Sequence, residues 1–149
     1  MSKLFFIIIL LALAPTVSAK QKTVDQLKTE AEHASPDQQG RLYAEIAEKL
    51  VAVADKQFTD AESVKGQATV QEILQYATRA HDLVIETRKK MKDTEKSLRE
   101  CHRRLDNLKR TLAAEDRPRV EAVEKQLEKL TEDVLESMFA PPEKKKDHK

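Results

Sequence analysis

The sequence predicts an all-α protein, in which an N-terminal three-helix bundle continues through one long helix into an antiparallel coiled-coil hairpin. Three observations predict this class. The 149 residues include only 2 glycines and 5 prolines, too few for the tight turns of a sheet protein. Charged residues make up 36% of the chain, so its apolar residues can form narrow stripes rather than the broad core of a large enzyme domain. Between Gly66 and Pro118, a seven-residue apolar repeat continues without a glycine or proline.

Residues 1–19 have the features of an export signal peptide. A lysine near the start is followed by an unbroken apolar run over 4–14, and small residues precede the cleavage site expected between Ala19 and Lys20. The alternative is a membrane-spanning helix, which needs about 18 or more apolar residues, and Pro15 ends this run too early. We therefore expect a periplasmic or secreted protein, with no transmembrane span after the signal is removed.

The predicted bundle covers about 23–85 and begins with two shorter helices. The first is expected over 23–34, where apolar residues recur every three or four positions. The second is expected over 36–58, because Ser35 can cap its start, a proline suits its first position, and one broad face is apolar. A second capping pattern, Thr-Asp-Ala-Glu at 59–62, predicts that the chain reverses there.

One helix from about 61 to 113 is expected next, because a single heptad phase holds along it. At about 1.5 Å per residue, a continuous helix of this length spans roughly 80 Å, although the repeat also allows a bend near 85–90. A last helix over about 117–139 folds back to complete the hairpin of about 86–139, and 141–149 is expected to be a disordered charged tail. The predicted seam of the long helix consists of Val70, Ile73, Ala77, Ala80, Val84, Thr87, Met91, Thr94, Leu98, Cys101, Leu105, Leu108 and Leu112.

Charge is segregated along the predicted hairpin. Residues 88–110 contain ten lysines and arginines against four acids, and residues 115–139 contain four against eight. The two arms should therefore attract, and pairs of an acid and a base four residues apart should support the long helix. These pairs are Glu86–Lys90, Glu95–Arg99, Glu100–Arg104 and Asp106–Arg110.

Six basic residues of this segment lie away from the predicted seam, and we call them the basic stripe. The stripe is either the solvated back of a coiled coil or a binding face for an anionic partner, which could be a protein, an envelope polymer or a lipid surface. Nucleic acid is not expected, because no aromatic residues are interleaved with these charges. The stripe consists of Lys89, Lys92, Lys96, Arg99, Arg103 and Arg110.

Two further features lie along the hairpin. Leu135, Met138 and Phe139 fall outside the seam of the last helix, so they either pack onto the bundle or form an exposed apolar patch. Cys101 is the single cysteine and lies in the seam phase, which favours a buried thiol. The alternative is an intermolecular disulfide in a homodimer, because an odd cysteine in an exported chain can pair between subunits.

No motif for catalysis, metal or cofactor binding is recognisable. The chain has no Gly-rich phosphate loop, no H-E-x-x-H run and no G-x-S-x-G turn. His102 follows Cys101, and Asp82 follows His81, but neighbouring positions on a helix point about 100° apart and rarely act together. We therefore expect no catalytic residue, no metal and no cofactor.

Several segments resemble a family of exported all-helical bacterial proteins of unknown function. These are Lys92-Asp93-Thr94-Glu95, His102-Arg103-Arg104-Leu105, the segment 108–112 and Glu115-Asp116-Arg117-Pro118. The resemblance covers mainly residues 40–135 and implies a helical architecture without an active site. The hairpin around Phe58-Thr59-Asp60 is also similar to tetratricopeptide-type helical pairs, without their 34-residue period. In its size, its signal and its basic helices, the chain is similar to periplasmic coiled-coil chaperones. It lacks the strand-rich body that those chaperones usually have.

Taken together, these features predict an exported, non-enzymatic helical protein that binds a macromolecule or acts as an envelope scaffold through its basic stripe. The alternative is a periplasmic holdase-type chaperone that shields unfolded exported proteins. An enzyme is the third hypothesis, and it would require a turnover that is lost when His81 or His102 is replaced.

Overall fold

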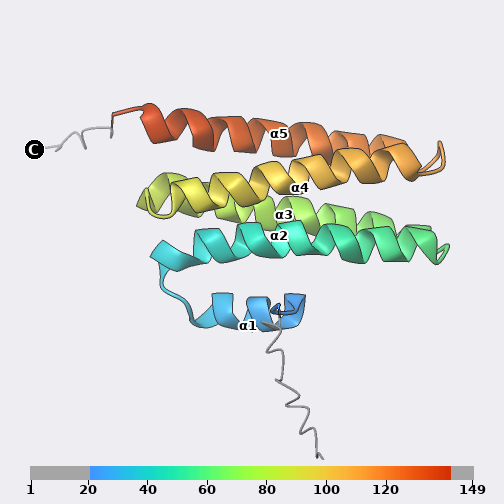
Figure 1. Ribbon diagram of the computed structural model, residues 1–149, viewed down its shortest axis with the longest axis horizontal. Helices are drawn as coiled ribbons and strands as arrows, with labels where there is room; N and C mark the ends of the chain where they lie inside the picture. The colour runs from blue at the N-terminus through green and yellow to red at the C-terminus, as the bar shows by residue number, and fades with distance from the viewer. Residues whose placement is uncertain (1–20, 142–149) are drawn as a thin grey trace, which may run out of the picture.

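The computed structural model describes residues 21–141, and these form five α-helices with no strand among them (Figure 1). The all-α class is thus confirmed for this part of the chain. The expected export signal, its cleavage site and residues 142–149 of the expected tail lie outside the described residues. Among the described helices, none is both long and apolar enough to cross a membrane. The helices are α1 (Val24–His33), α2 (Pro36–Thr59), α3 (Ser63–Thr87), α4 (Met91–Thr111) and α5 (Arg117–Phe139).

Helices α2 to α5 form a four-helix bundle with up-down-up-down topology (Figure 1). Around the bundle, α2 packs on α3 and α4, and α5 packs on the same two helices. The consecutive helices α3 and α4 therefore lie diagonally opposite each other in the bundle. Helix α2 runs parallel to α4, and α3 runs parallel to α5. The short α1 packs on the outside of α2, and its Lys28 reaches Glu72 of α3 at 2.6 Å.

The expectation of one continuous helix over about 61–113 is wrong. Helix α3 ends at Thr87, and α4 begins at Met91 in the opposite direction. The reversal uses two residues in the left-handed conformation, Arg88 (φ 54°) and Lys90 (φ 55°). Neither is a glycine, so each costs roughly 1–2 kcal/mol. After the turn, α4 packs along α2.

The division into a bundle and a separate hairpin, with residue 86 as the boundary, is also corrected. The prediction gave the segment after residue 86 a single partner, the last helix, but α4 packs on both α5 and α2. Two faces of α4 are therefore covered. The heptad phase could not reveal this fold-back, because the spacing of seven between Val84 and Met91 persists across the turn.

The predicted seam positions are buried on both sides of the turn. Of the thirteen seam residues, all but Thr87 and Met91 are buried, and these two are intermediate. The side chains of Val120, Val123, Leu127 and Val134 supply the facing layer from α5. Every buried apolar residue of the described chain lies within 27–134. A chain that starts at Lys20 therefore retains the whole described core.

The helix starts differ from the predicted capping. Ser35 is the N-cap of α2, but its side chain makes no capping hydrogen bond, and a complete capping box forms instead between Thr23 and Gln26 at α1. The chain reverses near residue 60 as predicted, with Ala61 in the left-handed conformation. At the start of α5, the carboxylate of Asp116 accepts hydrogen bonds from Ser63 (3.0 Å) and Gln67 (2.6 Å) of α3. These bonds fix the register of the parallel pair α3 and α5.

The end of α5 is exposed rather than packed onto the bundle. Phe139 is 81% exposed and Leu135 is 41% exposed, whereas Met138 is intermediate. The side chain of Val134 faces the core, and a helical residue five positions later points about 140° away from it. The expectation that these three residues pack onto the bundle is therefore wrong for Phe139, and the exposed alternative holds for it.

Candidate functional site: a basic groove between two parallel helices

The arginines of the basic stripe are neutralised by acids of their own helix. Arg99 pairs with Glu95 at 3.3 Å, Arg103 with Glu100 at 2.5 Å and Arg110 with Asp106 at 2.6 Å. Hydrogen bonds from Arg103 and Arg104 lower the pKa of Glu100 to about 2, so its carboxylate is ionised at neutral pH. The C-terminal half of the stripe is therefore locally close to neutral, in line with the predicted pairs Glu95–Arg99 and Asp106–Arg110.

The lysines of the stripe are different. Lys89, Lys92 and Lys96 are exposed, and none has an acidic partner within 4 Å among the described residues. All three lie at or near the start of α4. The free positive charge of the predicted stripe is thus concentrated in its N-terminal half.

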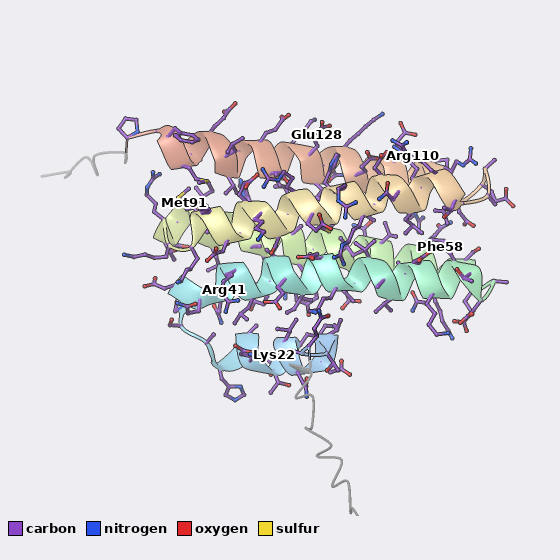
Figure 2. All side chains as sticks on the ribbon, in the orientation of Figure 1. Lys22, Arg41, Phe58, Met91, Arg110 and Glu128 are labelled. Atoms are coloured by element: carbon purple, nitrogen blue, oxygen red, sulfur yellow. The ribbon has the colours of Figure 1, made fainter. Side chains whose placement is uncertain are left out.

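A groove of about 900 Å³ runs between α2 and α4 beside these lysines. It exists because the two helices are parallel neighbours: Arg41 near the start of α2 and Met91 at the start of α4 lie at the same end of the bundle (Figure 2). Both helices present long polar side chains to it, so the groove is open and hydrophilic. Its lining consists of Gln38, Arg41, Glu45, Glu48, Lys49, Lys90, Asp93, Lys96, Ser97, Arg99, Glu100 and Arg104.

Arg104 bridges the two walls of this groove. Its guanidinium contacts Glu48 of α2 at 3.2 Å and Glu100 of α4 at 2.9 Å. On the α2 wall, Arg41 pairs with Glu45 at 3.3 Å. These pairs hold the arginine and glutamate side chains in fixed positions and leave the lysines as the free cations.

Three lining lysines have no acidic partner within the described chain, and we call them the groove lysines: Lys49, Lys90 and Lys96. The sequence identified only Lys96 of these three as part of a binding face. Lys49 belongs to α2, and nothing in its local pattern shows which helix its side chain will face. Lys90 was assigned to an ion pair with Glu86, which does not form because the helix ends between the two residues.

Cys101 is buried on α4, with no exposed surface. Burial is the main reason why the pKa of its thiol lies far above the usual value, and the nearby Glu48 carboxylate adds to the effect. The expected burial of this thiol is confirmed. A disulfide to a second chain would require α4 to leave the bundle, so this structure does not support that alternative.

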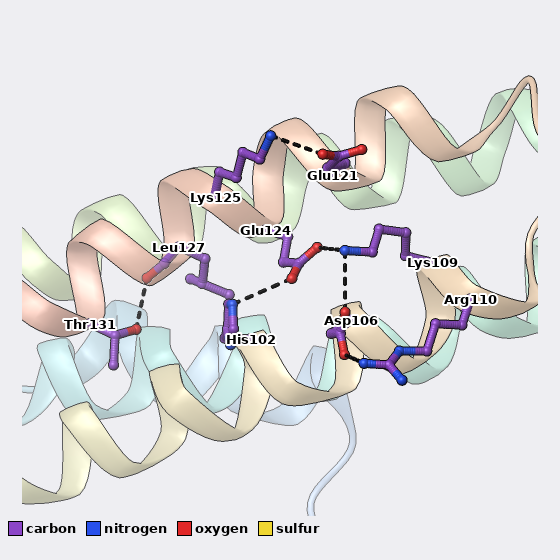
Figure 3. A network of polar contacts seen from close by, with 9 residues as sticks. All are labelled: His102, Asp106, Lys109, Arg110, Glu121, Glu124, Lys125, Leu127 and Thr131. Carbon is purple, nitrogen blue, oxygen red and sulfur yellow. Dashed lines mark hydrogen bonds and ion pairs between the residues drawn. The ribbon is translucent and has the colours of Figure 1, made fainter.

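A polar network joins α4 to α5 (Figure 3). Glu124 of α5, itself nearly buried, accepts a hydrogen bond from Lys109 and lies 3.5 Å from His102. Lys109 also contacts Asp106 at 3.2 Å, and Asp106 in turn binds Arg110. Hydrogen bonds from Arg110 and Lys109 lower the pKa of Asp106. This network is an interhelical ion-pair cluster in which each charge has a partner.

His81 of α3 lies between two carboxylates. Its Nδ1 is 2.8 Å from Asp82, and its Nε2 hydrogen-bonds Asp133 of α5. Burial opposes the charged imidazolium, but the hydrogen bonds to Asp133 and Asp82 outweigh it and raise the pKa of His81. The sequence predicted little from the neighbouring pair His81-Asp82, and it could not place Asp133 beside them. The two contacts link His81 of α3 to Asp133 of α5, and protonation of the ring strengthens this link.

The groove lysines are the feature of the described part that can attract an anionic ligand. Within residues 21–141, no group of three histidine, cysteine or acidic side chains is arranged to hold a metal ion. These lysines lie beside a frame of ion pairs formed by Arg41, Glu45, Glu48, Glu100 and Arg104. Comparison of the chain with protein-family models, with curated proteins and with solved structures found no match.

Proposed function

We propose that this protein is an exported, non-enzymatic scaffold that binds an anionic macromolecule along the groove between α2 and α4. One observation supports the proposal above the others. The three groove lysines have no acidic partner among the described residues, although nearly every other charge around them is paired. An extended acidic polymer or polypeptide could follow the groove and gain contacts with all three.

The frame around the lysines supports selective binding. Arg104 is held by Glu48 and Glu100, so its side chain is ordered before a ligand arrives. The fixed carboxylates among the lysines would repel an anionic ligand whose negative charges do not match the positions of the lysines. This repulsion gives specificity at some cost in affinity. Export, and hence an envelope partner, rests on the features of residues 1–19.

A binding assay with labelled poly-L-glutamate tests this proposal. The variant Lys49→Glu/Lys90→Glu/Lys96→Glu should lose binding, and wild-type binding should weaken as salt is raised, since exposed charges are screened. The matched control is Lys65→Glu/Arg119→Glu/Lys129→Glu, which makes the same change in net charge at exposed positions outside the groove. Equal binding by the groove variant and the control would contradict the proposal.

The same variants distinguish the holdase alternative. A holdase requires apolar surface for unfolded chains, and the large apolar side chains exposed in the described part are Val53, Val64, Leu135 and Phe139. Leu135 lines a hollow between α4 and α5, but the other side chains that line it are polar or charged. Suppression of aggregation by stoichiometric amounts of protein, unchanged in the groove variant, would favour the holdase over the scaffold. A turnover lost on replacing His81 or His102 would favour an enzyme over both.

A further inference from the structure

We propose that one end of the bundle binds the surface of an anionic lipid bilayer. This surface, which we call the bundle tip, consists of Lys89, Lys92, Met138 and Phe139. It shares no residue with the groove lysines, so it goes beyond the proposed groove function and does not depend on it.

A pair of hydrogen bonds brings the two parts of the tip together. The guanidinium of Arg88, in the turn between α3 and α4, donates to the backbone carbonyls of Ser137 (2.8 Å) and Ala140 (3.1 Å). The turn is thus tied to the last residues of α5, at the end of the bundle where α4 begins (Figure 1). Lys89 and Phe139, fifty residues apart in the sequence, therefore belong to one surface.

The apolar part of the tip is the end of α5. Phe139 is 81% exposed, and Met138 beside it is only partly covered. Val64, at the opposite end of the bundle, is the other large apolar side chain of the described chain with comparable exposure, at 86%. An exposed aromatic ring gains free energy when it moves from water into the headgroup–acyl boundary of a membrane.

The cationic part of the tip belongs to the turn and the start of α4, which Arg88 ties to the end of α5. Lys89 and Lys92 are exposed and have no acidic partner among the described residues. Lysines close to an anionic membrane strengthen its binding by about fivefold each, and this attraction weakens with salt.

The combination favours lipid over a protein partner. A protruding ring needs a shaped pocket in a protein, whereas the deformable headgroup layer accepts it without one. Ring insertion together with lysine–headgroup attraction is how peripheral proteins bind anionic membranes. The proposed association is peripheral, because the ring enters only the headgroup layer and the lysines contact its surface.

Vesicle co-sedimentation tests the proposal with residues 20–149, which retain the described core but lack the apolar run at 4–14 that could itself bind lipid. Vesicles of phosphatidylcholine alone are compared with vesicles that also contain phosphatidylglycerol. We expect binding only to the second kind. Phe139→Ser should weaken it by about tenfold, and Lys89→Glu/Lys92→Glu by at least about 25-fold.

Matched controls lie at the opposite end of the bundle. Val64→Ser removes an apolar side chain that is similarly exposed but not aromatic. Lys65→Glu/Arg119→Glu makes the same change in net charge as the tip double variant. Both controls should bind as wild type does, and circular dichroism should show that all variants are equally helical.

Three results would overturn the proposal: equal binding to both kinds of vesicle, no loss in either tip variant, or an equal loss in the controls. Capture of a protein by the tip without any vesicle binding would replace lipid with a protein partner and also overturn it. The variant Lys49→Glu/Lys90→Glu/Lys96→Glu separates the two proposals. This variant should retain most of its binding to vesicles and lose its binding to poly-L-glutamate. The groove proposal and the lipid proposal can therefore be contradicted independently.

Discussion

Thr94 is a polar residue in an apolar position of α4. Its side chain is fully buried, and its hydroxyl has no hydrogen-bond partner in the structure. A buried hydroxyl without a partner costs roughly 1–3 kcal/mol compared with one in water. Thr131 of α5, also buried, differs in donating a hydrogen bond to the carbonyl of Leu127 at 2.7 Å. The two threonines therefore form a matched pair.

Replacing Thr94 by valine should stabilise the protein by about 1 kcal/mol, because the shape is kept and the unpaired hydroxyl is removed. Urea unfolding followed by circular dichroism measures the change. The control Thr131→Val should give no gain, since it removes a hydroxyl that has a partner. A loss of stability in Thr94→Val would mean that the hydroxyl is satisfied in solution.

Ion pairs within one helix were predictable from the spacing of residues in the sequence. Glu95–Arg99, Glu100–Arg104 and Asp106–Arg110 form as the spacing of four predicts, because helix geometry alone places the partners together. Ion pairs between helices, such as Arg104–Glu48, were not predictable. Their formation depends on which helices become neighbours, and local spacing does not contain that information.

At the scale of the elements, the turn between α3 and α4 determines the architecture. It reverses the chain within three residues and has neither of the residues that usually signal such a turn, glycine and proline. Its left-handed residues are a lysine and an arginine, which rarely adopt this conformation, so the local sequence does not signal the turn. This explains why the helices themselves were predicted well and the break was not.

The strain in this turn can be measured. Lys90→Gly should stabilise the protein by about 1 kcal/mol, since glycine adopts the left-handed conformation without a steric cost. Lys89→Gly is the control, because its backbone is not left-handed and it should gain nothing. Both variants remove one exposed lysine charge. If the two have equal stability in urea unfolding, the left-handed conformation of Lys90 is not present in solution.

The link between α3 and α5 through His81 should make stability depend on pH. The folded-state pKa of His81 is raised above its ordinary value of 6.5, so protonation favours the folded state. The stabilisation is fully present below about pH 6.5 and is lost as the pH rises through the raised pKa.

Urea unfolding at a series of pH values tests this link. The free energy of unfolding of the wild type should fall as the pH rises above about 6.5, because the folded-state pKa lies above that ordinary value. In Asp133→Asn the fall should be smaller, because a principal partner of the imidazolium is gone. An identical pH dependence in both proteins would show that Asp133 does not pair with His81.

At the scale of the whole molecule, the sequence predicted which side chains are buried better than where the helices go. The heptad positions from Val70 to Leu112 are buried almost without exception, because one side of the chain faces the core before and after the turn. One continuous helix and two helices joined by a tight turn would bury the same heptad positions. The repeat therefore could not distinguish the two arrangements. The groove was missed for the same reason, since it requires α2 and α4 to be neighbours.

The fold-back of α4 onto α2 is the central claim, because the groove and the bundle tip both depend on it. Spin labels at Lys65 and Arg110, two exposed positions in α3 and α4, test it by electron–electron distance measurement. In the bundle these positions lie at the same end of diagonal helices, so we expect a distance below roughly 30 Å, including the label arms. A distance of about 70 Å, as a continuous helix would give, would contradict the account.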